Sequence, residues 1–348
     1  MLNYDEFKSK VEKEFLSYMS EKYQNMQLEF YPVNKVNQLM DGILLKSPEK
    51  RIGISPTIYI NDMYDHYMRT ENFQEAVTNA ARMLERAYEE RDRVASINFD
   101  DAKNNIVFQL VNTMQNAEML SDIPHREYQD LSIVYRWIVK IEEEGIQSTL
   151  IKNSLAENLG FNEEQLFRLA AENTRRILPP CIKNMTDVIR DLFIKDGMSP
   201  ELTDIMMEEI QAEQPMWVIT NNVGINGAAS MLYEDKLHEL AEKLGQDLYL
   251  MPSSIHEVIA VPASLGDPYE LAQMVTEINM SEVQLNERLS NQVYHYDKNS
   301  RELTLATDTP NKSLEMDMKE ETEVSNIIYR PDLFPLDMQE DEGMQPHM

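Results

Sequence analysis

Residues 216–263 read MWVITNNVGINGAASMLYEDKLHELAEKLGQDLYLMPSSIHEVIAVPA. Three short apolar runs, around Val218, Tyr249 and Ile259, have the length of buried strands. A turn-rich segment and a helical pattern separate the first two runs, whereas a proline and two serines separate the last two. This order predicts a βαβ-β unit at about 216–262.

The first two strands of this unit are expected to lie side by side and parallel, because about 26 residues including a helix connect them. Parallel strands end at one edge of a sheet, where ligands bind beside helix N-termini. Loop 221–227 and turn 252–254 would meet there, with His256 as a candidate catalytic acid–base residue. The candidate ligand-binding residues are Asn221, Asn222, Gly224, Asn226, Gly227, Ser253, Ser254 and His256.

The same residue types also suit an ordinary turn. Asn and Gly adopt positive φ readily, and Asn226-Gly227 is a common turn pair. The loop lacks the Gly-Lys-Ser/Thr of a P-loop, and Gly224 and Gly227 are spaced GxxG without the first glycine of GxGxxG. The loop therefore predicts no nucleotide cofactor, and a structural turn is an equally good interpretation.

Motifs for metals and nucleophiles are incomplete. His256-Glu257 begins the HExxH pattern of zinc proteases, but Ala260 stands where the second histidine belongs. Ser253 or Ser254 with His256 suggests a nucleophile–base pair, but the GxSxG elbow of a serine hydrolase is missing. No metal site and no cofactor are predicted.

One acidic group stays open to two interpretations. Asp62, Asp65 and His66 lie at helical spacing and could hold a divalent cation. Acids also suit a solvated helix start, which explains the same residues.

The overall charge limits the possible partners. The 348 residues contain 32 Lys+Arg against 61 Asp+Glu, a formal net charge of −29, which repels nucleic acids and anionic membranes. Cys181 is the single cysteine, so a disulfide framework within one chain is excluded. The N-terminal residues lack the pattern of a signal peptide, and no apolar run has membrane-spanning length. We expect a cytoplasmic protein without direct nucleic-acid or membrane binding.

Patterns outside the central stretch predict an α+β fold of mixed sheets covered by helices. A Pro-Pro pair after Leu178 follows a helix whose start carries an Asn162/Gln165 capping box. This break predicts an N-terminal lobe over 1–178 and a C-terminal lobe over 179–306, each α+β.

The C-terminal lobe is expected to end in a β-hairpin over about 293–306. Residues 307–348 contain 11 acids and 3 bases, so this tail is expected to be mostly disordered. Its apolar segment at 327–336 is the exception.

Four segments resemble an uncharacterised bacterial family, a domain of unknown function in Firmicutes-type anaerobes. They are ISPTIYIND (54–62), VNTMQNAEMLSDIPHREYQDLSIVY (111–135), NNVGINGAASMLY (221–233) and PSSIHEVI (252–259). The resemblance covers roughly residues 1–306 and leaves the acidic tail as an extension. It implies a bacterial cytosolic protein and carries no activity or catalytic residue to transfer.

Three functional hypotheses follow. The lack of a complete catalytic motif, the negative charge and the tail's apolar segment favour a non-catalytic protein-interaction or regulatory module. The first alternative is a small-ligand or anion-binding protein, or an enzyme, that uses loop 221–227 and turn 252–256. The second is an acidic mimic of nucleic acid, which rests on charge alone.

Overall fold

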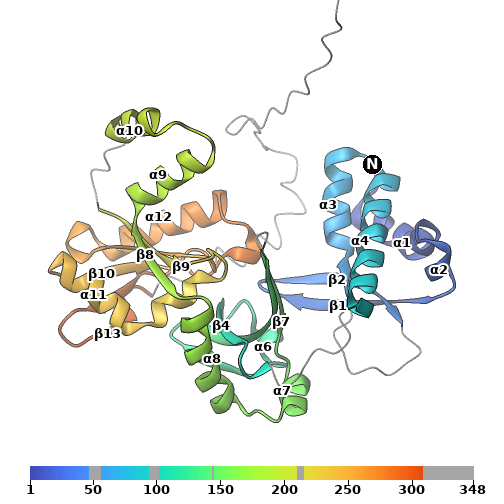
Figure 1. Ribbon diagram of the computed structural model, residues 1–348, viewed down its shortest axis with the longest axis horizontal. Helices are drawn as coiled ribbons and strands as arrows, with labels where there is room; N and C mark the ends of the chain where they lie inside the picture. Colours follow the sequence, from blue (N-terminus) through green and yellow to red (C-terminus); the bar gives the residue numbers. More distant parts are fainter. Residues whose placement is uncertain (47–55, 94–101, 143–144, 210–214, 309–348) are drawn as a thin grey trace, which may run out of the picture. The chain divides into compact units, whose positions relative to one another are not determined.

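The structure is a computed structural model that describes residues 1–46, 56–93, 102–142, 145–209 and 215–308 (Figure 1). Helices and three sheets make it α+β, as the sequence predicts. Of the predicted tail, only Thr307 and Asp308 lie within the described residues. No helix in the described part of the chain is both long and apolar enough to cross a membrane.

The N-terminal elements build a three-stranded antiparallel sheet with helices around their own hydrophobic core. In order they are α1 (Tyr4–Glu14), η1 (Phe15–Tyr18), α2 (Glu21–Gln24), β1 (Gln27–Lys35), β2 (Gln38–Lys46), β3 (Ile58–Tyr59), α3 (Ile60–Thr70) and α4 (Phe73–Arg93). Phe7, Phe15 and Ile43 are fully buried in this core. The 3-10 turn η1 separates α1 from α2, and its first residue, Phe15, points into the core.

A second antiparallel sheet, which we call the middle sheet, has the long strand β6 at its centre. Its elements are β4 (Ile106–Asn112), α6 (Ala117–Leu120), β5 (His125–Tyr128), β6 (Leu131–Glu142), β7 (Gly145–Leu150), α7 (Asn153–Leu159) and α8 (Glu163–Ile177). The predicted capping box is confirmed at the start of α8, where Asn162 and Gln165 exchange two hydrogen bonds of 2.9 Å. Leu166 and Ala170 of α8 belong to the same hydrophobic core as the buried side of this sheet.

The third sheet has six antiparallel strands in the order β13-β12-β10-β11-β9-β8. Its elements are β8 (Pro180–Asn184), α9 (Met185–Lys195), α10 (Pro200–Glu209), β9 (Trp217–Asn221), η2 (Gly227–Leu232), α11 (Glu234–Leu244), β10 (Leu248–Met251), β11 (Val258–Pro262), η3 (Ala263–Leu265), α12 (Pro268–Ser281), η4 (Leu285–Glu287), β12 (Tyr294–Asp297) and β13 (Glu302–Leu305). The predicted terminal hairpin is present as β12 and β13.

The predicted pairing of the central unit needs correction. β9 and β10 are not side by side, because β11 lies between them and pairs antiparallel with both. The short return after β10 makes β11 its hairpin partner, and β9 then pairs with the free edge of β11. All described strand pairs are antiparallel, so the expected mixed sheets are wrong. Since both flank one antiparallel strand, β9 and β10 still point the same way and end at one edge.

The two faces of the six-stranded sheet are covered by different helices (Figure 1). Side chains alternate along each strand: Leu248 and Leu250 join the core that contains α11, whereas Met251 joins the cluster that contains α12. The same alternation places Val258 on one face and Val261 on the other. The connections at the strand ends therefore sit at the rim between these two covered faces.

Candidate functional site

The two predicted segments meet at the edge where β9 and β10 end, and we call them together the rim (residues 221–227 and 252–256). Three hydrogen bonds join them or the residues beside them: Thr220 Oγ1 donates to the His256 carbonyl at 2.8 Å, Asn226 N to His256 Nδ1 at 3.2 Å, and Ala228 N to the Ile255 carbonyl at 3.1 Å. The convergence thus arises although β11 separates the two strands.

Asn221 closes the first rim loop from inside. Its buried side chain accepts hydrogen bonds from Val223 N at 2.9 Å and Gly224 N at 2.8 Å, and donates to the Ile225 carbonyl at 2.8 Å. Asn222 and Gly224 are exposed at the loop tip. The exposed Asn222 side chain can therefore contact a ligand without breaking the turn.

Gly227 lies where the loop packs against the turn. A Cβ there would lie 2.5 Å from the His256 carbonyl oxygen and 2.8 Å from Asn221 N. Asn226, directly before it, has a φ of 54°. Both residues are explained by the close approach of two backbone segments. The helix expected after the loop begins only at Glu234, because the 3-10 helix η2 separates it from the loop in the chain.

The second rim segment is held by the chain that precedes β12. Ser253 accepts a hydrogen bond from Leu289 N at 2.9 Å through its carbonyl, and Ser254 forms a bridge with Arg288. The buried Ser254 Oγ accepts a hydrogen bond of 3.0 Å from the backbone N–H of His256. This hydroxyl contacts the main chain of His256 rather than its ring, so the two do not form a nucleophile–base pair.

His256 is a rim residue whose ring nitrogen Nε2 could take part in binding or proton transfer. Its Nδ1 accepts the Asn226 N–H, so the neutral ring carries its proton on Nε2. Nε2 lies 3.5 Å from Glu287 Oε1, and the two side chains are 25% and 36% exposed. Burial raises the pKa of the neighbouring Glu257 carboxyl; the charge of His256 opposes this shift, and that of Glu287 adds to it.

This arrangement limits what the imidazole can do. A general base needs a free ring lone pair, yet the Nδ1 lone pair is used by Asn226 and Nε2 carries the proton. His256 can therefore donate Nε2–H to Glu287 or to an added anion. Proton abstraction from a substrate would require loss of one of these contacts.

The family assignment agrees with the resemblance described above. A model of a family of unknown function, DUF5688, matches residues 4–298. The chain belongs to this family. No curated protein and no solved structure matches the chain. The DUF5688 match includes every rim residue and ends before the acidic tail, and it brings no substrate or catalytic residue with it.

Sequence reasoning missed two groups of polar residues in this DUF5688 protein. Glu287 reaches the rim from η4, far along the chain from loop 221–227. Arg136 and Gln109 lie within apolar strands of the middle sheet and contact each other at 3.2 Å. A charged residue inside the run IVYRWIV was the available signal for the second group, since such positions favour apolar side chains.

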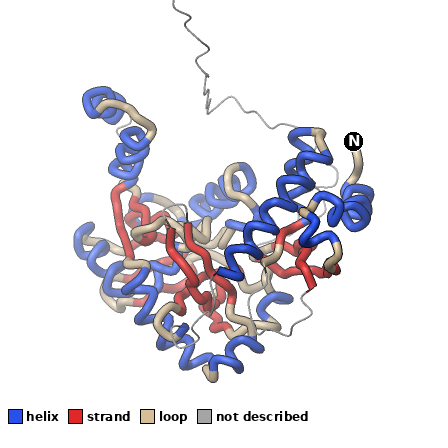
Figure 2. Tube along the Cα trace, turned by 45° about the vertical axis from the view of Figure 1, so that its right-hand side comes forward, coloured by secondary structure: helices blue, strands red, loops and turns tan. Residues whose placement is uncertain are grey.

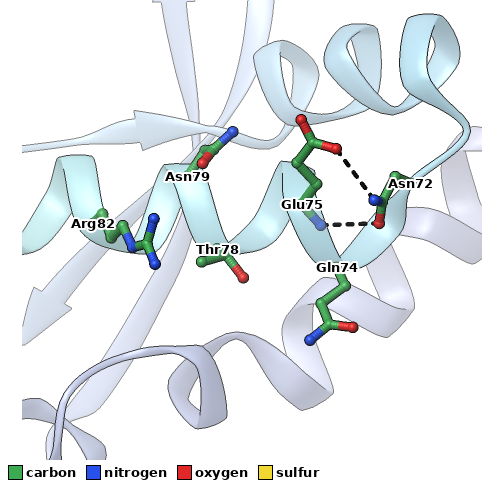
Figure 3. A pocket seen from close by; sticks show the side chains of 6 residues that line it. All are labelled: Asn72, Gln74, Glu75, Thr78, Asn79 and Arg82. Atoms are coloured by element: carbon green, nitrogen blue, oxygen red, sulfur yellow. Dashed lines mark hydrogen bonds between the residues drawn. The ribbon is translucent and has the colours of Figure 1, made fainter. Parts of the chain in front are cut away.

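A hollow of about 260 Å³ lies along the first turns of α4, lined by Asn72, Gln74, Glu75, Thr78, Asn79 and Arg82 (Figure 3). Asn72 and Glu75 exchange two hydrogen bonds of 3.1 Å, which cap the helix start. The lining comes from one helix and is mostly exposed. A helix cap explains these contacts without a ligand.

Asp62, Asp65 and His66 are placed on α3. The Nε2 atom of His66 lies 3.5 Å from the Glu75 carboxylate of α4. Burial raises the pKa of both the Asp62 and the Asp65 carboxyl, and the charge of Asp62 adds to the shift at Asp65. Across the described ranges, no group of three histidine, cysteine or acidic side chains is arranged to hold a metal ion.

Proposed function

We propose that this DUF5688 protein is a non-catalytic interaction module whose α9–α10 hairpin binds a basic amphipathic helix of another protein. One observation carries the proposal: α9 contains Val188, Ile189 and Leu192, yet none of its residues is buried. Leu192 is 52% exposed, and Ile205 of α10 is 57% exposed. Apolar side chains gathered in this way on a surface are typical of interaction sites.

The two helices form a unit of their own. Arg190 of α9 pairs with Asp204 of α10 at 2.5 Å, and α10 buries Thr203 and Met207. Both helices follow β8 at the edge of the six-stranded sheet, and in both views neither covers a face of that sheet (Figures 1 and 2). Within the described residues, the apolar side chains of these two helices therefore stay exposed and available to a partner.

Charge complementarity indicates the chemistry of that partner. Residues 185–209 contain seven acidic and two basic residues. A second copy of the chain would bring the same negative charge to the contact, which opposes self-association. A helix with one apolar and one basic face matches both the exposed side chains and the acids.

Binding of two synthetic peptides tests this function. One peptide places leucine and lysine at helical spacing, and the other has the same composition in scrambled order. We expect the Leu192→Ser/Ile205→Ser double variant to bind the amphipathic peptide at least about tenfold more weakly than the wild type does, because two central apolar contacts are lost.

The matched control is Ile278→Ser, which changes a 46% exposed apolar residue on α12 and should bind like wild type. Equal affinity for the scrambled peptide, or unchanged binding by the double variant, would contradict the proposal. A homodimer in light scattering that the double variant dissociates would also contradict it, since the hairpin would then bind a second copy.

Ligand binding at the rim is the alternative, and the partly exposed His256 side chain supports it. A ligand held there contacts Asn222 or His256. Exchange of either residue, by Asn222→Ala or His256→Gln, should then remove the stabilisation that the ligand gives in a thermal-shift screen.

A further inference from the structure

Arg136 of β6 is held by neutral groups alone among the residues that the structure describes. Its Nε donates to Ser148 Oγ at 2.9 Å, Nη2 to the Ser148 carbonyl at 3.2 Å, and Nη1 to Gln109 Oε1 at 3.2 Å. A guanidinium has five N–H donors, so two remain after these bonds. The three bonds fix the plane of the group without neutralising its charge.

Arg126 of β5, on the same sheet, shows the usual alternative. It donates to both carboxylate oxygens of Glu163 at 3.0 and 2.9 Å, and to Glu164 at 2.7 Å. Within the described residues, no carboxylate oxygen lies within 4.0 Å of Arg136. In a chain with a net charge of −29, an arginine without an acidic partner at that distance is unexpected.

A second cation, Lys35 of β1, lies near enough to Arg136 for the two charges to interact. Val36, next to it, packs against the cluster that contains Val134, and Leu150 joins that cluster too. Val134 lies two residues from Arg136 and therefore on the same face of β6, and Leu150 is the direct partner of Arg136 across β7.

The hairpin turn that carries Lys35 is fixed. Asn37 N donates to Asn116 Oδ1 at 2.8 Å, and Asn116 Nδ2 donates to Asn37 Oδ1 at 2.7 Å. The Lys35 ammonium lies 4.7 Å above the Tyr59 ring. Like Arg136, it has no carboxylate oxygen within 4.0 Å among the described residues.

Two cations held near each other are unfavourable by themselves. Burial lowers the pKa of both groups, and the charge of Arg136 lowers that of Lys35 further, while the charge of Asp62 opposes the shift at Lys35. An anion placed between them would remove this cost. Asp62 already offsets part of the charge of Lys35. A bound anion is therefore stabilised mainly by its hydrogen bonds to the two remaining N–H donors of Arg136.

We propose that Arg136 and Lys35 bind a small oxyanion, either a phosphoryl group or a carboxylate. The two free N–H groups of Arg136 form charge-assisted hydrogen bonds with its oxygens. Lys35 supplies the second charge from the hairpin: the residue as a whole lies at the surface, whereas its ammonium is desolvated beside the Tyr59 ring. Gln109, which orients the guanidinium, is a positioning residue. The site is independent of the α9–α10 hairpin, so either proposal can fail alone.

Anion-dependent thermal stability tests the site. The wild-type protein is titrated with inorganic phosphate and, separately, with malonate, at an ionic strength held constant with sodium chloride. We expect one of them to raise Tm beyond the chloride baseline, because a ligand that binds the native state stabilises it. A response to phosphate assigns a phosphoryl ligand, and a response to malonate assigns a carboxylate.

Three variants separate a site from a general salt effect. Arg136→Gln and Lys35→Gln should each weaken the apparent affinity at least about tenfold, whereas Arg126→Gln should keep the wild-type response. If Arg136→Gln does not fold, the exposed Lys35 position decides alone. No response in the wild-type protein, or an unchanged response in Lys35→Gln, would overturn the proposal.

Discussion

The rim and the cluster of Arg136 and Lys35 both contain several polar groups, but these groups have different hydrogen-bond partners. At the rim, the Asn221 side chain and Ser254 Oγ bond to the backbone. Around Arg136, neutral oxygens fix a charge that no described acid neutralises. The difference teaches that turn residues meeting at a sheet edge can serve the fold, whereas a fixed but unmatched charge is available to the anion that we propose.

Gly227→Ala gives the largest expected effect and tests whether the rim is tightly packed. The new Cβ would meet the His256 carbonyl and Asn221 N at 2.5 and 2.8 Å. Backbone cannot move as a flexible side chain does, so we expect a loss of about 3 kcal/mol in the free energy of unfolding. Urea denaturation measures it.

The matched control is Gly224→Ala, where φ is +75° but no atom lies within 4 Å of the new Cβ. It should cost about 1 kcal/mol from backbone strain alone. Equal losses in the two variants would show that conformation, and not packing, explains both glycines.

Asn221→Ala should have the next largest effect. It leaves the backbone N–H groups of Val223 and Gly224 and the Ile225 carbonyl without their hydrogen-bond partner. We expect a loss of about 2 kcal/mol in urea denaturation, since unpaired polar groups near the interior are costly. Asn222→Ala, at the exposed neighbour, should change stability by less than about 0.5 kcal/mol. A larger effect at Asn222 than at Asn221 would reverse the interpretation of this loop.

Arg136→Gln should destabilise the protein by about 1 kcal/mol, which is less than Asn221→Ala. Three hydrogen bonds to neutral acceptors are lost, but an unfavourable charge is removed with them. Arg126→Gln, which breaks a carboxylate pair, is the comparison on the same sheet. Unfolding of both proteins in urea, without added phosphate, gives the two values. A loss at Arg136 well above that at Arg126 would mean that the cation has a mainly structural role.

The smallest expected effect concerns pH. Burial raises the pKa of Glu257 in the folded protein, so this group stabilises the fold at low pH, and that contribution is lost as pH rises through the folded pKa. Glu257→Gln should therefore unfold at a higher urea concentration than wild type at neutral pH. The difference should vanish below the unfolded value of about 4.5. A destabilised Glu257→Gln protein at neutral pH would contradict the shift.

Much of the fold could be predicted from local signals. The capping box at Asn162 and the terminal β-hairpin each depend on a few adjacent residues, and the structure has both. The strand order could not be predicted, because nothing near Val218 or Tyr249 shows that β11 would take the place between them. That choice depends on hydrogen bonds to distant strands.

The candidate sites show the same limit. The meeting of loop 221–227 with the turn at Ser254 could be predicted, since the direction of β9 and β10 alone places both at one edge. The position of Lys35 near Arg136 could not be predicted, because it depends on a hairpin turn that Asn116, far along the chain, holds in place. Whether the rim binds a ligand stays a prediction.

One anion titration compares the two regions directly, with His256→Gln and Arg136→Gln followed side by side at constant ionic strength in whichever of phosphate and malonate raises the wild-type Tm. If the unmatched charge marks the binding site, His256→Gln keeps the wild-type rise in Tm and Arg136→Gln loses it. Loss of the response in His256→Gln with retention in Arg136→Gln would contradict this account and place the anion at the rim.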